Sequence, residues 1–347
     1  MNKYQKHQQG VTLIELMIAV AISSVLLGGI IEVYLGSKQS YNLVEESSRL
    51  QENGRFGLDI MTREIRGAGF LGCLPNPSVG KDNSENNFLN HLDSNDAAFQ
   101  FSEVLTGIDG GGTASDSISF SSTSGQGIHP TAKQGKAANI MITPDHGLVD
   151  GDIILISDCT AGDIFQANQA QNALLVHNTG TDTPGNAQIA VCTNPGNNGH
   201  CLSKEYGEDA DIYRLQRVTY AIGSTRNDGE GNPINGLFRN GVEIIENVEN
   251  MQILYGEDTD VDDVFHVPNQ YVTATDIGYV DNANPGNMAN AVTVRVALLL
   301  RGERDLLPAD TTQTHQLLDA QITTNDRRLY KIFSTTITVR NRSLNDS

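Results

Sequence analysis

The sequence predicts an α+β fold, in which one long N-terminal helix packs on a large antiparallel, β-rich domain. Three features indicate this fold: an apolar run over residues 11–31, an amphipathic helical pattern over residues 32–68, and alternation of apolar and polar residues in many later segments. A chain of 347 residues is long enough to bury a large core. Because residues 69–347 contain no internal repeat and no long linker, we expect one domain there rather than two.

Residues 1–10 are a polar and basic leader, which by the positive-inside rule stays in the cytoplasm. As a helix, residues 11–31 span about 30 Å, the thickness of one hydrocarbon core. A cleaved secretory signal is the alternative, because the Ala-Val-Ala sequence at 19–21 resembles a signal-peptidase site. The apolar run continues well past residue 21 and carries a carboxylate, Glu15. We therefore favour a retained membrane helix, with the following domain exported to the other side of the membrane from the leader.

The amphipathic half of the helix is expected to end at Gly67, since no helix breaker interrupts the pattern before that residue. Gly54 and Gly57 lie within it at a cost in helix propensity, which predicts close backbone contact or a gentle bend. Apolar residues spaced by about 3.6 positions form one stripe that should face a sheet: Val44, Leu50, Leu58, Met61 and Ile65.

After residue 68 the hydrophobic period changes to two, which predicts strands separated by Gly-, Asn- and Ser-rich loops. Asn240 and Gly241 mark a hairpin turn. The expected strands are 98–105, 117–122, 140–143, 152–157, 173–177, 188–191, 212–222, 237–245 (interrupted by that turn), 248–255, 291–300 and 329–339.

The charge balance excludes nucleic acid as a partner. The chain has 42 acidic and 23 basic residues and a formal charge of −19, whereas phosphate binding requires a basic surface. An acidic surface suits an exported domain that does not adhere to anionic lipid headgroups. Arg340 and Arg342, on the last predicted strand, are interpreted as a solvated strand face rather than a partner contact.

Four cysteines predict two disulfides in an exported chain, and no C-x-x-C pair indicates zinc or thioredoxin-like chemistry. Four cysteines allow three pairings. In one of them, Cys192 and Cys201 close a short turn-rich loop, and Cys73 and Cys159 then tie the end of the helix to the sheet. Buried free thiols are the alternative.

No motif supports catalysis or a cofactor. H-E-x-x-H, G-x-S-x-G and P-loop sequences are absent, and the histidines occur singly, mostly beside turns, which favours surface positions. Asp258, Asp260 and Asp262 have the spacing of a calcium loop, but Asp263 stands where that loop needs glycine and Asn269 where it needs glutamate. We interpret this segment as a solvated acidic loop and expect no enzyme, metal or cofactor.

The motif G-VTLIE at residues 10–15, after the basic leader, resembles the class III signal of type IV pilins and type II secretion pseudopilins. Further motifs along the whole chain are similar to those of PilW-type minor pilins of the type IV pilus. They are LDIMTREIRGAGFLGC at 58–73, SDCTAGDIFQ at 157–166, NVENMQILYGEDTD at 247–260, VTVRVALLLR at 292–301 and TTITVRNR at 335–342. The resemblance implies the type IV pilin-like version of the predicted fold.

The resemblance also implies processing. Prepilin peptidase is expected to cleave between Gly10 and Val11 and to methylate the new amine of Val11, although the family usually begins its mature chain with Phe. Glu15 would pair with the N-terminal amine of a neighbouring subunit. Elementary chemistry agrees: a lone carboxylate in a membrane costs about 2.5–3.5 kcal/mol. An ammonium about 4 Å away returns about 4 kcal/mol at an effective dielectric of 20.

These expectations define a minor pilin that helps to prime pilus assembly, with a size that favours the filament tip. The implied partners are other minor pilins, the major pilin, prepilin peptidase and the inner-membrane assembly platform. Two alternatives stay open: a type II secretion pseudopilin, and a tip adhesin that binds a ligand through loops 75–130 or 256–290.

Overall fold

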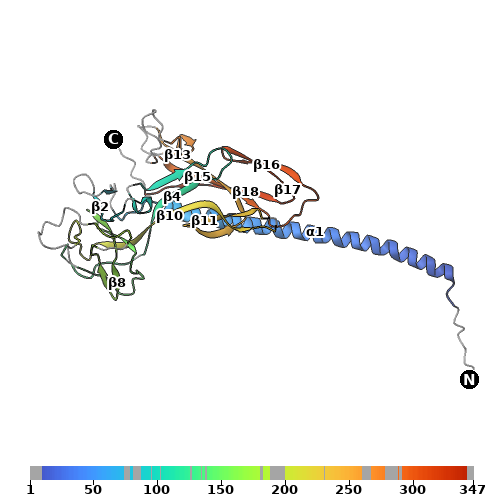
Figure 1. The fold of residues 1–347 in the computed structure, drawn as a ribbon, viewed down its shortest axis with the longest axis horizontal. Helices are drawn as coiled ribbons and strands as arrows, with labels where there is room; N and C mark the ends of the chain where they lie inside the picture. Colours follow the sequence, from blue (N-terminus) through green and yellow to red (C-terminus); the bar gives the residue numbers. More distant parts are fainter. Residues whose placement is uncertain are drawn as a thin grey trace, which may run out of the picture.

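The structure, a computed structural model, combines one long helix with an antiparallel-rich β domain, so the predicted α+β class is confirmed. It describes residues 10–73, 79–80, 87–94, 96–101, 103–125, 127–133, 135–136, 139–179, 183–187, 200–229, 231–259, 267–277, 288 and 291–341. The N-terminal end of the helix projects away from the sheets, and the segments around β2 and β8 lie at the opposite end of the molecule (Figure 1).

Helix α1 (Leu13–Arg66) is 54 residues long, about 80 Å at the usual rise. It ends at Gly67, as predicted, and the end of the chain's last strand covers its C-terminus. The backbone nitrogen of Arg340 donates to the Arg66 carbonyl at 3.4 Å, and Asn341 Nδ2 donates to the Gly67 carbonyl at 3.4 Å. Two carbonyls that the helix leaves unpaired are thereby satisfied.

The largest sheet has nine strands, in the order β1-β2-β7-β6-β10-β11-β12, with β4 also paired to β10 and β3 to β4. Most of its neighbours are antiparallel, but β2 pairs in parallel with both β1 and β7. Its strands are β1 (Val79–Gly80), β2 (Phe88–Asn90), β3 (Leu105–Ile108), β4 (Ser117–Ser124), β6 (Ile153–Ser157), β7 (Gly162–Gln166), β10 (Asp211–Asn227), β11 (Pro233–Arg239) and β12 (Val242–Glu246).

A second sheet of four strands has the order β14-β13-β15-β18 and is antiparallel throughout. Its strands are β13 (Val248–Glu257), β14 (Gln270–Val272), β15 (Ala291–Arg301) and β18 (Tyr330–Thr338). The hairpin β16 (Thr311–Leu317) and β17 (Ala320–Asp326) forms a sheet of its own. A small fourth sheet completes the described strands, with β9 (Leu174–Val176) between β5 (Ile140–Met141) and β8 (Gln169–Gln171).

The amphipathic half of α1 packs on these sheets through the predicted stripe. Met61 and Ile65 are fully buried, and Leu50 is nearly so, in one cluster with residues from β10, β13 and β15. The two glycines permit this close approach, as predicted. A Cβ added at Gly54 would lie 2.3 Å from the Phe333 ring, and one at Gly57 2.5 Å from Ile245 Cδ1. Both distances are shorter than any packed contact allows.

Two strand predictions need correction or lie outside the described residues. The predicted strand 98–105 is wrong, because β3 begins only at Leu105. Ala97–Phe99 is a 3₁₀ turn, η1, because Asp96 accepts from the backbone nitrogen of Ala98 through its side chain and from that of Phe99 through its carbonyl. The predicted strand 188–191 falls outside the described residues. Val44, placed in the buried stripe, is instead 70 % exposed, where α1 leaves the domain.

The end of the molecule opposite to the helix N-terminus has hydrophobic clusters of its own, apart from the cluster under α1. We call the described residues within 79–94, 139–187 and 200–210 the distal lobe. Ile154, Ile156 and Phe165 centre one of its clusters, and Phe88 and Ile164 belong to another. The lobe therefore rests on a separate apolar core, carried beyond the end of α1 (Figure 1).

Candidate assembly site

The N-terminus of α1 is built by Thr12 and Glu15, which form a capping box. The backbone nitrogen of Glu15 donates to Thr12 Oγ1 at 3.4 Å. In return, Thr12 donates to Glu15 Oε2 twice, from its backbone nitrogen at 2.9 Å and from its hydroxyl at 2.8 Å. Glu15 thus has a partner within its own helix while the leader is attached. Thr12 was not predicted as a site residue, although the T-x-x-E spacing of the capping box is present at residues 12–15.

The membrane half of α1 makes no contact with the β domain. Large apolar side chains from Val11 to Leu35 are 53–79 % exposed, far more than in a folded core. By length and composition this part of the helix can cross a membrane. Gly10 and Val11 precede the helix in extended backbone, and both are exposed. Nothing within the described chain covers the predicted cleavage site.

One face of this segment is shallowly grooved. Glu15, Ala19 and Ser23 follow one another at intervals of four residues, so they share one helix face, and Val11, just before the helix, lines the same groove. Small residues on such a face let a second helix backbone approach closely. Glu15 lies at the end of this small-residue face, where a neighbouring helix would meet it.

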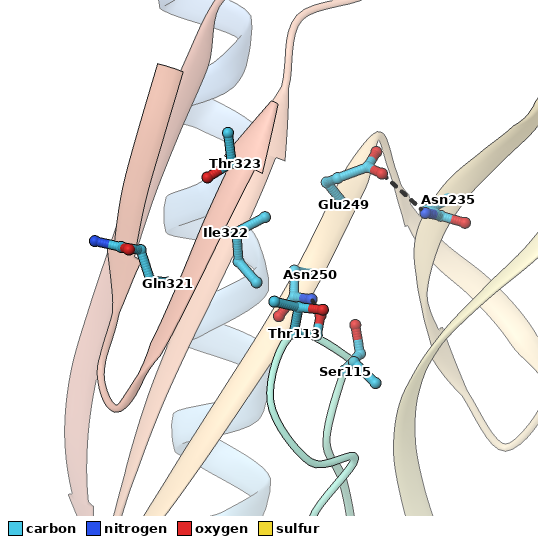
Figure 2. A pocket seen from close by; sticks show the side chains of 9 residues that line it. Thr113, Ser115, Asn235, Glu249, Asn250, Gln321, Ile322 and Thr323 are labelled. Atoms are coloured by element: carbon cyan, nitrogen blue, oxygen red, sulfur yellow. Dashed lines mark hydrogen bonds between the residues drawn. The ribbon is translucent and has the colours of Figure 1, made fainter. Parts of the chain in front are cut away.

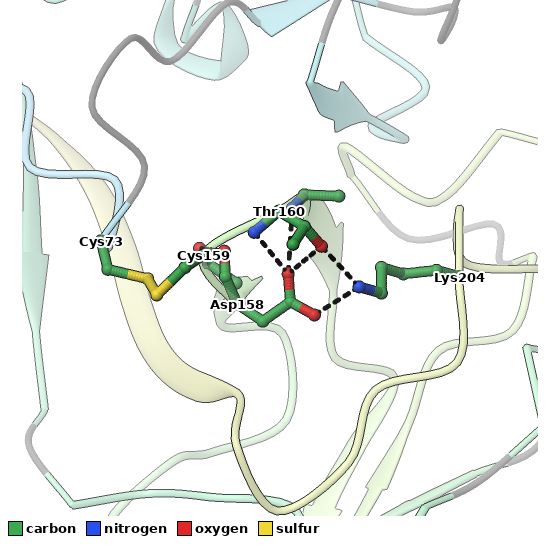
Figure 3. The surroundings of a disulfide bond; sticks show 7 residues. Cys73, Asp158, Cys159, Thr160 and Lys204 are labelled. Carbon is green, nitrogen blue, oxygen red and sulfur yellow. Dashed lines mark hydrogen bonds and ion pairs between the residues drawn. A yellow bond between two sulfur atoms is a disulfide. The ribbon is translucent and has the colours of Figure 1, made fainter.

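The disulfide between Cys73 and Cys159 joins the segment after α1 to the turn between β6 and β7, across a sequence separation of 86 (Figure 3). Cys201 is also disulfide-bonded, and Cys192, its predicted partner, lies outside the described residues. Beside the first bridge, Asp158 accepts from Lys204 Nζ and from Thr160. Burial opposes ionisation of Asp158, but these bonds outweigh it and lower its pKa to about 2.

Three histidines that are far apart in sequence meet in the distal lobe, which corrects their assignment to surface positions. His91, His177 and His200 are at most 2 % exposed, and the Nδ1 atoms of His177 and His200 are 2.9 Å apart. His91 Nε2 contacts Asp163 Oδ1 at 2.5 Å. Burial, together with the two neighbouring histidines, lowers the pKa of His200 to about 2, so its imidazole is neutral. No local sequence pattern could reveal this convergence.

This histidine cluster lacks the geometry of a nucleophilic triad. Ser203 donates its hydroxyl to the Asp163 carboxylate at 2.7 Å, and Tyr206 donates to the same carboxylate at 2.7 Å. In a triad the imidazole lies between the hydroxyl and the carboxylate. Here His91, Ser203 and Tyr206 all contact the buried carboxylate of Asp163. This is the arrangement of a structural hydrogen-bond network.

A polar groove of about 480 Å³ separates the β16–β17 hairpin from β13 and β11 (Figure 2). Glu249 at its edge accepts from Asn235 Nδ2 at 3.2 Å, and Thr113 brings in the loop before β4. Amide, hydroxyl and carboxylate groups dominate its nine lining residues, and none of the nine is aromatic. The groove includes part of the predicted adhesin loop 75–130, whereas most of 256–290 lies outside the described residues.

For the calcium hypothesis, Asp260 and Asp262 lie outside the described residues, whereas Asp258 follows directly after β13. Within the described ranges, no group of three or more His, Cys, Asp or Glu side chains is placed to hold a metal ion.

Comparison with known proteins agrees with this geometry at both ends of the chain. Residues 207–341 match the family of type IV pilus-assembly protein W, and residues 5–31 match the prokaryotic N-terminal methylation motif. The first match covers the whole four-stranded sheet and β10, β11 and β12 of the nine-stranded sheet, and the second covers part of the leader and the apolar run 11–31. Neither curated proteins nor solved structures gave a match. The methylation motif at the start of the chain, the exposed apolar helix that it includes and the PilW match in the β domain together support a PilW-type minor pilin of the type IV pilus.

Proposed function

We propose that this membrane-anchored minor pilin is cut by prepilin peptidase between Gly10 and Val11, methylated at Val11, and then helps to prime pilus assembly at the filament tip. Residues 11–31 hold the precursor in the inner membrane, with the leader in the cytoplasm and the domain 69–347 in the periplasm. Its partners are other minor pilins, the major pilin and the assembly platform of that membrane.

The observation that carries this proposal is the fully exposed apolar half of α1, with Glu15 as its only charged residue. The sixteen large apolar side chains exposed between Val11 and Leu35 are stable only in lipid or against other helices. A filament core of aligned helices supplies the second environment after the membrane supplies the first. The same surface therefore supports both the anchored precursor and the assembled subunit.

Cleavage would change the partners available to Glu15. Before cleavage the nitrogen of Val11 is a neutral amide, and the carboxylate accepts hydrogen bonds from Thr12. After cleavage that nitrogen becomes an ammonium with a reference pKa near 8. Two opposite charges about 4 Å apart attract by about 4 kcal/mol at an effective dielectric of 20. Processing thus creates the charge that a buried Glu15 needs, from its own chain or from a neighbouring subunit.

The distal lobe supports a place at the tip. It lies beyond the C-terminal end of α1, opposite to the membrane segment (Figure 1). If α1 aligns with the filament axis, this end faces away from the cell. A neighbouring subunit on that side of the filament would have to leave room for the lobe. A terminal position removes that requirement.

The substitution Glu15→Ala tests the charge pair. The variant should be cleaved normally, yet enter pili poorly, so that cells carry fewer pili than the wild type; immunoblots and counts of pili measure both. Thr12→Ala is the matched control, because it removes the capping box but keeps the carboxylate. Wild-type piliation by Glu15→Ala, or an equal defect in Thr12→Ala, would contradict the role of the charge.

A further inference from the structure

The C-terminal end of α1 borders an open groove of about 750 Å³. The groove is lined by residues of the last turn of α1, of the end of β4 and of β10, and by residues that follow β18. Phe70 and Tyr213, in edge-to-face contact with ring centroids 5.4 Å apart, supply an aromatic surface. Ser122 and Ser124 of β4 contribute hydroxyl groups. The volume lies within the range of ligand and peptide sites.

Two arginines of this groove have no carboxylate partner. Arg66 and Arg340 are both exposed, and the backbone nitrogen of Arg340 bonds to the carbonyl of Arg66, which holds the two residues side by side. Within the described chain, neither guanidinium takes part in an ion pair or a hydrogen bond. Most other arginines do: Arg239, for example, binds Glu64, and Arg214 binds Asp152.

The acidic groups near the groove do not neutralise these arginines. Glu64 already accepts from Arg239 Nε at 3.0 Å and from the Tyr220 hydroxyl at 2.6 Å. Arg63 adds a third cation, whose pairing with Asp59 is exposed to solvent and therefore weak. A chain with a formal charge of −19 thus keeps a cationic groove.

We propose that this groove binds an acidic peptide segment of a protein partner, with its carboxylates on Arg66 and Arg340. Guanidinium groups pair with carboxylates through two parallel hydrogen bonds, and adjacent arginines with nearby hydroxyls suit a segment that carries several carboxylates. A neighbouring subunit of the pilus would supply this segment, and that identification rests on the proposed function. The binding of an acidic segment by the groove does not.

The position of the groove excludes lipid headgroups as its ligand. Arg66 lies 35 residues beyond the end of the apolar run, which corresponds to about 50 Å of helix. That distance is longer than the whole hydrocarbon core and far beyond the interfacial layer. Arg340, interpreted from the sequence as part of a solvated strand face, is exposed as expected, but it follows β18 (Tyr330–Thr338) and lines this groove.

The test uses the full chain in detergent micelles and a fluorescent hexaglutamate peptide, with binding followed by anisotropy. The double variant Arg66→Glu/Arg340→Glu should weaken binding about tenfold or more, and added salt should weaken wild-type binding. Lys38→Glu/Arg55→Glu is the matched control. It makes the same change in net charge at two exposed cations on α1 outside the groove, and should stay within about twofold of the wild type.

Equal loss of binding in both double variants, or no binding by the wild type, would overturn the proposal. Displacement of hexaglutamate by N-acetylneuraminic acid at lower concentration than by unlabelled hexaglutamate would assign the groove to anionic saccharides and also overturn it. Because the assay requires neither cleavage nor a pilus, its failure is distinct from failure of the proposed function, which the piliation of Glu15→Ala reports.

Discussion

At the scale of single residues, the absent Cβ of Gly54 determines how closely α1 approaches β18. Gly54→Ala should destabilise the fold, because the new methyl group would lie 2.3 Å from the Phe333 ring. The same substitution at Gly36, around which no atom lies within 4 Å, gains the helix propensity of alanine without a clash. We expect the free energies of unfolding of the two variants to differ by about 1–3 kcal/mol. Urea unfolding of both in detergent measures this, and equal values would contradict the packing.

Residue-scale predictions from the sequence succeeded where the signal was local. The glycines within the stripe predicted close contact, and Gly67 marked the end of the helix correctly. The stripe was extended too far at Val44, because periodicity shows which side of a helix is apolar but not where the covering sheet begins. At that boundary Glu45 pairs with Arg304, which follows β15 in the chain.

At the scale of elements, β15 shows what periodicity could not predict. Val294, Val296 and Leu298 face the helix core, as their alternation indicates. Ala297 and Leu299, on the opposite face, are also buried, because Leu317 and other residues of the β16–β17 hairpin cover them. That hairpin was not predicted: its strands are rich in threonine and glutamine, and only a few apolar residues mark its inner face.

The histidine cluster makes the stability of the distal lobe depend on pH. His200 has a pKa lowered to about 2 by burial and by His91 and His177, against about 6.5 when unfolded. Below pH 6.5 the unfolded chain therefore binds a proton that the folded chain does not, and the free energy of unfolding falls as pH falls, down to about pH 2. Asp163 and Tyr206 are the other titratable groups of the cluster.

His200→Gln should remove this dependence. Between pH 7.5 and pH 5.5 the wild type should lose about 1.4 kcal/mol more than the variant, as measured by urea unfolding. His146→Gln, a partly exposed histidine outside the cluster, should retain the wild-type dependence. Burial raises the pKa of Asp116 to about 6, which acts with the opposite sign but equally in all three proteins. Identical pH dependence in the wild type and His200→Gln would contradict a buried neutral imidazole.

At the scale of the whole molecule, the Cys73–Cys159 disulfide ties the distal lobe to the end of α1. Closing a loop of 86 residues stabilises the folded chain by about 4–5 kcal/mol in the chain-entropy model. Cys73→Ser/Cys159→Ser should lower the free energy of unfolding by up to that amount. Thr160→Ser, which keeps the hydroxyl beside Asp158, serves as the control and should unfold like the wild type. A double variant as stable as the wild type would show that the lobe is held by packing alone.

The overall plan of the molecule followed from the sequence because it depends on long, periodic segments. The helix, the positions of β4, β10, β13, β15 and β18, and the processing signal were all predicted. The arrangements that escaped prediction join residues distant in sequence: the parallel pairing of β2 with β7, the buried histidines, and the groove between α1 and Arg340. Each depends on which strands become neighbours, and no local pattern encodes that choice.

The central claim is that the exposed helix becomes an assembly element once the leader is removed. N-terminal mass spectrometry of the protein from sheared pili tests it most directly. We predict a mature chain that begins with N-methylated Val11, and a Gly10→Val variant that stays in the membrane as uncleaved precursor. An N-terminus at Met1 in pili, cleavage after Ala21, or absence of the protein from pili would contradict this account.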